Sequence, residues 1–251
     1  MSSIFQKVGG YCGLLGCFQY VVLTAIAMSF YQGGTLDNPA AQGYTFWKNN
    51  FCDLGRTVSI SGQENSVSMA LYSTTMITLG VLLSIYFISR FRSYTIDYMA
   101  GIFSKLGAVF GLGNCAGAIF TAFVPSDLFP LLHSNATAIV TVPMMPMMLS
   151  HAISTWKGED VHFSKKLILM TLLIVMMIAT TSVLFFREDF ADRESATVIL
   201  AYNASQKIMV YSWLAFITTH AIHSKKGSHL VLELKDTKDD SFKTTDIKLS
   251  R

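Results

Sequence analysis

Long apolar runs alternate with short polar patches along the whole chain, and this spacing is its dominant pattern. A helix that crosses about 30 Å of hydrocarbon needs roughly 20 predominantly apolar residues. Because every backbone amide in hydrocarbon must be satisfied within its own segment, each long run is expected to be a helix. The pattern therefore predicts an all-α fold, a polytopic transmembrane bundle of about six helices. The predicted spans lie near residues 11–31, 67–89, 99–124, 130–153, 165–186 and 196–222.

Composition agrees with lipid as the solvent. The chain is 51% hydrophobic and only 14% charged, whereas about a quarter of the residues in a soluble domain are charged. Its basic residues flank apolar runs rather than line a groove, which argues against a nucleic-acid partner. The first run is interpreted as a span rather than a signal peptide, whose apolar stretch would be shorter. The expected partner is the bilayer of the plasma membrane or an endomembrane, and no cofactor is predicted.

The lysines and arginines that flank the runs fall into two sets that alternate from loop to loop. The larger set is assigned to the cytoplasmic side. It comprises Lys7, Arg90, Arg92, Lys105, Lys157, Lys165, Lys166, Lys225 and Lys226, while the other comprises Lys48, Arg56, Arg187 and Arg193. An even number of spans then places both termini in the cytoplasm. Residues 1–223 are expected to form the transmembrane domain, and residues 224–251 a polar, disordered cytoplasmic tail.

Two features inside the spans predict irregular packing. Pro143 and Pro146 remove amide donors from the fourth span and should kink it, with neighbouring methionines filling the space beside the kink. A moving gate is the alternative to a purely structural kink. Glycines at four-residue steps in the third span, at residues 107–111 and 113–117, should let another helix approach closely. Self-association through that face is left open, so a homo-oligomer is an alternative.

The connection between the first two spans carries aromatic residues interleaved with polar ones, a composition that suits the membrane interface. Asp53 and Arg56 are three apart and placed to pair on a helical turn, and Asn65 offers an amide near the start of the second span. Either this loop satisfies its own polar groups or it forms a lid or a ligand site. Asp127 is expected to cap the helix that follows it; alternatively it pairs with His133 for proton transfer or metal binding.

The sixth predicted span is interrupted by polar residues, among them Asn203 and Lys207. A lysine at that depth is costly unless it meets an acidic partner, a polar group or water, so it marks a candidate functional site. Its expected partners are Asp53 or Asp127 if their loops dip inward, and otherwise Asn and Tyr groups or water.

Three histidines lie near the cytoplasmic ends of the fourth and sixth predicted spans. They are His151, His220 and His223. The last two share a helix face, which is compatible with two metal ligands. This group is the alternative, metal-binding site, although interfacial histidines commonly have no such role.

The stretch from Asn50 through Cys52 and Asp53 to Gly55, with a later Asn65, resembles an uncharacterised membrane family known as domain of unknown function 998. The segment from Pro125 to Asp127 followed by His133 is similar to a second feature of that family. The resemblance covers most of residues 11–222 and implies a six-helix fold with an outward polar site, without an established activity. Cys52 stands where the family pattern has a serine, so the resemblance implies no hydroxyl nucleophile there. In layout the chain also distantly resembles damage-regulated autophagy modulator proteins.

These observations predict a multi-pass membrane protein whose non-cytoplasmic polar site binds or transports a small polar solute or a lipid headgroup. The candidate ligand-binding residues are Asp53, Arg56, Asn65, Asp127, His133, Asn203 and Lys207. The alternatives are a metal-assisted, membrane-embedded lipid hydrolase and a non-catalytic scaffold or regulator.

Overall fold

The computed structural model describes residues 2–92, 97–157, 163, 166–168, 170–172, 174, 197 and 199–223. Within these ranges the chain is all-helical and forms no β-strand, only two isolated bridges in the first loop. The expected fold class is confirmed at this level. Most of the fifth predicted span, the 187–195 connection and the 224–251 tail lie outside the described residues.

Four of the helices in the described part are long and apolar enough to cross a membrane, and they span Ile4–Phe30, Ser66–Phe91, Tyr98–Thr121 and Pro130–Lys157. They correspond to the first four predicted spans. The helices themselves are α1 (Ser2–Phe30), η1 (Phe51–Gly55), α2 (Ser66–Phe91), α3 (Tyr98–Thr121), α4 (Pro130–Thr141) and α5 (Met144–Lys157). A further helical stretch covers residues 199–223.

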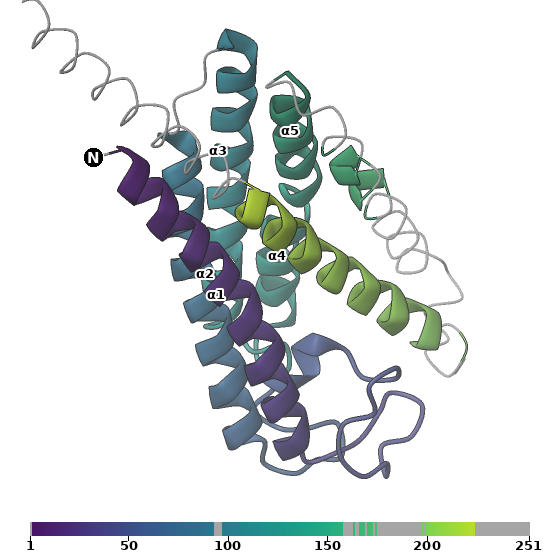
Figure 1. Ribbon diagram of the computed structural model, residues 1–251. Coiled ribbons are helices and arrows are strands. Elements are labelled where there is room, and N and C mark those ends of the chain that lie inside the picture. The colour runs from purple at the N-terminus through teal and green to yellow at the C-terminus, as the bar shows by residue number, and fades with distance from the viewer. Residues whose placement is uncertain are drawn as a thin grey trace, which may run out of the picture.

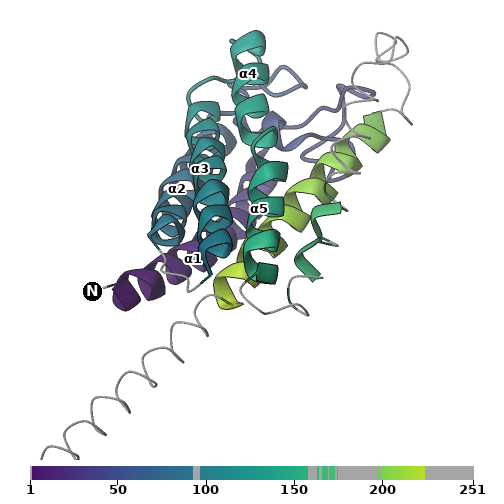
Figure 2. The same ribbon diagram turned by 90° about the horizontal axis from the view of Figure 1, so that it is seen from above.

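The helices pack in chain order, α1 on α2, α2 on α3, and α3 on both α4 and α5. Figure 1 shows α1 and α2 side by side, with the 199–223 helix, yellow-green, crossing the bundle at a slant. Its beginning lies toward the loop that joins α1 to α2, and this placement is also visible in Figure 2. Loop residues 31–65 therefore cover one end of the bundle, where several helices converge.

The predicted kink in the fourth span is confirmed as a break between α4 and α5. Pro143 has no amide to continue the helical hydrogen bonds, and Asn114 on α3 supports the end of α4 by donating from Nδ2 to the Val140 carbonyl at 2.6 Å. Met144, Met147 and Met148 are fully buried directly after the break. Flexible methionine side chains fill the irregular space there, as the sequence predicts.

Close approach is confirmed at three of the four α3 glycines, Gly107, Gly111 and Gly117, but not at Gly113. A Cβ added at Gly111 would lie 2.5 Å from the Phe87 ring, and one at Gly107 would lie 2.9 Å from the imidazole of His151. At Gly117 the nearest atoms belong to the α4 backbone, 2.7 Å away. Only a residue without a side chain allows α3 to pack this tightly against α2, α4 and α5.

Candidate functional site

The first loop is built around a short 3₁₀ helix, η1, held by its own polar side chains. Asn50 caps η1 by accepting the Cys52 amide on Oδ1 at 3.0 Å. In return the Asp53 carboxylate accepts the Asn50 amide at 2.8 Å. This reciprocal arrangement is a capping box. The Asp53 carboxylate therefore stabilises η1, and the Cys52 side chain lines the space between the helices.

Asn49 connects the two halves of the loop and is fully buried. Its Nδ2 donates to the Gly34 carbonyl at 2.8 Å and to Asp53 at 3.1 Å, while its Oδ1 accepts the Thr45 amide at 2.8 Å. Burial raises the pKa of Asp53, and the hydrogen bonds from Asn49 and Asn50 oppose that shift. Asn49 is thus the polar centre on which the loop is organised.

Lys207 is buried, with only 1% of its surface exposed. Its ammonium donates to the Asn49 carbonyl and lies above three aromatic rings. The centroids of Phe51, Phe46 and Tyr44 are 5.1, 5.2 and 5.6 Å from Nζ. A desolvated ammonium over aromatic faces is favourable through cation–π attraction. Among the described residues, the Lys207 ammonium therefore contacts a carbonyl and an aromatic cage, and no acidic side chain contacts it directly.

Two further residues of the 199–223 helix bind the loop backbone. Asn203 donates from Nδ2 to the Lys48 carbonyl at 2.5 Å, and Gln206 accepts the Phe51 amide on Oε1 at 3.1 Å. Together with Lys207, these contacts join residues about 155 positions apart in the chain. The polar residues that interrupt the sixth predicted span thus attach this helix to the loop by hydrogen bonds.

Asp127 binds the loop from the turn between α3 and α4. Its carboxylate accepts the Thr57 hydroxyl at 2.5 Å, the Thr57 amide at 3.0 Å and the Val58 amide at 3.0 Å. Burial opposes ionisation, but these hydrogen bonds prevail and lower the pKa of Asp127. The expectation that Asp127 caps the next helix is wrong, because α4 begins at Pro130 with no side-chain cap. The pre-organised φ of proline makes that cap dispensable.

Arg56 and Asn65 also donate hydrogen bonds to carbonyls of the loop. The predicted Asp53–Arg56 ion pair does not form, since Arg56 donates from Nε to the Val58 carbonyl at 3.0 Å instead. Asn65 is buried and donates from Nδ2 to the carbonyls of Arg56 and Leu54. Six of the seven candidate ligand residues thus gather at this end of the bundle, with the polar contacts of each directed at the loop.

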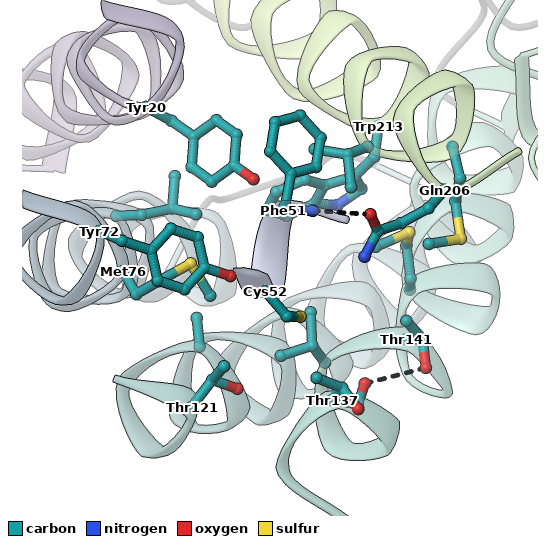
Figure 3. A pocket seen from close by; sticks show the side chains of 16 residues that line it. Tyr20, Phe51, Cys52, Tyr72, Met76, Thr121, Thr137, Thr141, Gln206 and Trp213 are labelled. Carbon is teal, nitrogen blue, oxygen red and sulfur yellow. Dashed lines mark hydrogen bonds between the residues drawn. The ribbon is translucent and has the colours of Figure 1, made fainter. Parts of the chain in front are cut away.

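Behind the loop, between the helices, lies an apolar cavity with a volume of about 80 Å³ (Figure 3). Most of its wall is aromatic or aliphatic, with Cys52 on the loop side. Its polar or sulfur-bearing lining also includes Tyr72, Gln206 and Trp213. Figure 3 shows the Tyr72 hydroxyl directed toward the Cys52 side chain.

Trp213 carries the most unusual polar atom of this cavity. The residue is 2% exposed, and its indole Nε1–H has no hydrogen-bond partner among the described residues. A buried donor without a partner costs about 1–3 kcal/mol. Trp213 therefore brings a buried donor without a partner to the wall of the cavity.

His133, the seventh candidate residue, lies on the loop side of α4 and is 7% exposed. Its Nδ1 donates to the Val124 carbonyl at 2.7 Å. Nε2 is buried and has no hydrogen-bond partner among the described residues. The predicted Asp127–His133 pair does not form, since each residue binds elsewhere.

The three histidines of the alternative metal site do not make one site. His151 and His220 pack with ring centroids 4.6 Å apart, and His220 Nδ1 is 2.5 Å from the Tyr86 hydroxyl. His223 instead stacks on Phe163, with centroids 3.9 Å apart. Among the described residues, no three His, Cys, Asp or Glu side chains gather closely enough to hold a metal ion.

Comparison of the chain with family models, with curated proteins and with solved structures finds no match. The resemblances drawn from the loop motif and the helix layout stay predictions. The arguments below therefore rest on the geometry of this chain.

Proposed function

We propose that the chain is a six-span membrane protein, with both termini in the cytoplasm, that binds a lipid in the cavity beneath its non-cytoplasmic loop. Four apolar helices support the membrane part of this proposal. The 199–223 helix and the predicted fifth span supply the other two crossings. The alternation of basic residues favours the orientation, with Lys48 and the loop outside and Lys157 inside.

The buried, unpaired indole N–H of Trp213 is the observation that carries the lipid proposal. Ligand sites are mostly apolar, with a few polar groups that orient the ligand. Here the apolar wall suits a hydrocarbon segment, and the indole donor suits an ester or carboxyl oxygen at its end. The cavity volume accommodates the part of a lipid next to its ester, with the rest of the chain between the helices.

A lipid fits this cavity better than a small polar solute. The polar side chains on which a solute site would depend, above all Asp127 and Lys207, contact the loop instead. These contacts favour a role for both residues in holding the loop over the cavity. The candidate polar residues are thus proposed to hold the loop in place and to make few direct contacts with the lipid.

Native mass spectrometry of protein purified in mild detergent tests the proposal. The informative variant is Trp213→Phe, which keeps the ring and removes the donor. Trp156→Phe is the matched control, because Trp156 is 54% exposed on α5. We expect a bound lipid in the wild type and in Trp156→Phe, and at least a tenfold lower occupancy in Trp213→Phe. Equal occupancy in all three forms, or an empty wild type, would contradict the proposal.

A further inference from the structure

Two histidines and a tyrosine pack together inside the bundle, on the side of the cavity away from the loop. His151 on α5 and His220 on the 199–223 helix are 0% and 3% exposed, and their ring centroids are 4.6 Å apart. The hydroxyl of Tyr86 on α2 lies 2.5 Å from Nδ1 of His220. The cluster of His151, His220 and Tyr86 therefore joins three helices through groups that can gain or lose a proton.

His151 is the least satisfied member of this cluster. Neither of its ring nitrogens has a hydrogen-bond partner among the described residues. The ring stacks on Phe87 with centroids 6.0 Å apart, and a Cβ added at Gly107 would lie 2.9 Å from Nε2. Burying a polar group without a hydrogen bond costs free energy, and burying a charge without a partner costs far more. The packed helices therefore tolerate a neutral imidazole here and disfavour an imidazolium.

The ionisable groups around the cluster do not compensate an added proton. Those of the described residues that act on it electrostatically are Arg90 on α2, His223 on the 199–223 helix and Cys17 on α1. No carboxylate is among them. The closest part of α3 is Gly107, which has no side chain. A proton on either imidazole would therefore place a positive charge near that of Arg90, away from water.

The two histidines continue the wall of the cavity along the same two helices. Met144 on α5 and Trp213 on the 199–223 helix line the cavity, and His151 and His220 follow them by seven residues each. Seven residues are two helical turns, about 10 Å, so each histidine lies on the same face of its helix as the cavity residue before it. Figure 2 shows the ends of these two helices side by side. The His151–His220 contact therefore joins α5 to the 199–223 helix directly beyond the cavity.

We propose that the His151–His220 contact keeps the cavity closed at neutral pH and that acid separates the two helices, which speeds the exchange of bound lipid. This inference rests on the proposed lipid-binding function and concerns its regulation. A hydrated imidazole takes up a proton with a pKa of about 6.5. Because the packed helices disfavour the charge, protons favour the state in which the helices are apart and the imidazoles are hydrated. The packed state is thus fully favoured above about pH 6.5, and it loses that advantage as the pH falls further.

Lipid exchange is measured in the parent variant Trp47→Phe, Trp156→Phe, in which Trp213 is the only tryptophan. The full-length protein in mild detergent is loaded with methyl 9,10-dibromostearate, an ester that does not titrate, and then mixed with excess methyl stearate. Recovery of Trp213 fluorescence gives the rate of release. Between pH 7.5 and pH 5.5 each histidine should raise the population of the separated state about tenfold. We therefore expect release to be about 100-fold faster at pH 5.5, since two histidines contribute.

His151→Gln in this parent is the informative variant, because glutamine cannot take up a proton. Its pH effect should fall to about tenfold, from His220 alone. His151→Leu, a second uncharged variant, should behave alike, and the unfolding temperature of each shows whether it is intact. His223→Gln is the matched control, since His223 stacks on Phe163 instead, and it should keep the full pH effect.

The outcomes separate this inference from the lipid-binding proposal. Release that does not depend on pH in the parent, or an equal pH effect in the parent and both His151 variants, would overturn this inference and leave lipid binding standing. No quenching of Trp213 by the brominated ester at pH 7.5 would overturn both.

Discussion

The ammonium of Lys207 and the backbone carbonyl of Asn49 are hydrogen-bonded inside the protein, although 158 positions separate them in the chain. A helix that the sequence places in the membrane is thereby attached to a loop that the sequence places outside it. The loop dips to meet the lysine, and the aromatic rings of Tyr44, Phe46 and Phe51 close around it. Of these residues, Phe51 also lines the cavity.

Replacing Lys207 by Met should destabilise the protein, because the Asn49 carbonyl loses its charged donor in a buried place. We expect a loss of about 1–3 kcal/mol, measured as a lower unfolding temperature and faster proteolysis within residues 31–65. Lys48→Met is the matched control. Lys48 pairs with Asp37 at 2.7 Å but is 41% exposed, so the loss there should be below about 1 kcal/mol. Equal effects of the two substitutions would mean that Lys207 does not hold the loop.

Asp127 should make stability depend on pH in the acid range. Since the hydrogen bonds of Thr57 and Val58 lower its pKa in the folded state, its contribution is fully present above the pKa of a free aspartate, about 3.9. It is lost as the pH falls through the lower, folded value. Asp127→Asn should therefore cost about 1–2 kcal/mol at pH 7. The difference in unfolding temperature between variant and wild type should shrink below about pH 4; a constant difference would contradict this account.

Substitution of two glycines on α3 by alanine should have opposite effects on stability, because Gly111 is crowded and Gly113 is not. Gly111→Ala places a methyl group 2.5 Å from the Phe87 ring, and such overpacking costs about 1–3 kcal/mol. At Gly113 the nearest atom to an added Cβ is 3.7 Å away, on Pro143. There the substitution should be neutral or stabilise by up to about 1 kcal/mol through helix propensity. The unfolding temperatures of the two variants test this expectation. A loss of stability in Gly113→Ala as large as that in Gly111→Ala would argue against the observed packing.

The proposed orientation predicts opposite accessibility for two exposed lysines. Lys48→Cys in the loop should react with a membrane-impermeant maleimide on intact cells, above the background of the native cysteines. Lys157→Cys at the end of α5 should react only after permeabilisation. Labelling of both from the same side would reject the proposed topology.

The sequence predicts the helices better than it predicts the site. Apolar length alone locates the four long helices, and Pro143 predicts the break between α4 and α5. The reason is that both depend on local composition. The capping role expected for Asp127 is wrong because a backbone turn near Thr57, 70 positions away, competes for the carboxylate.

The residues of the cavity were missed for a related reason. Tyr72 and Trp213 lie in apolar runs, and Gln206 lies in the polar interruption of the last predicted span, all without a distinguishing motif. Whether such residues line a cavity depends on which helices pack together. In the sequence, Cys52 is notable only as a departure from a family pattern, and a pair of His133 with Asp127 is only an alternative to a capping role for Asp127. The one available signal in the sequence is the polar interruption of the last predicted span, where Lys207 and Asn203 are buried and contact the loop.

The most direct test of the central claim is fluorescence quenching of Trp213 by a brominated fatty acid. In the double variant Trp47→Phe, Trp156→Phe, Trp213 is the only tryptophan left, and bromine quenches only at short range. The protein is placed in nanodiscs of unbrominated lipid and titrated with 9,10-dibromostearic acid. The account predicts saturable quenching of Trp213, and weak, linear quenching when Trp156 is the only tryptophan. Linear quenching of Trp213 as weak as that of Trp156 would show that no lipid chain occupies the cavity.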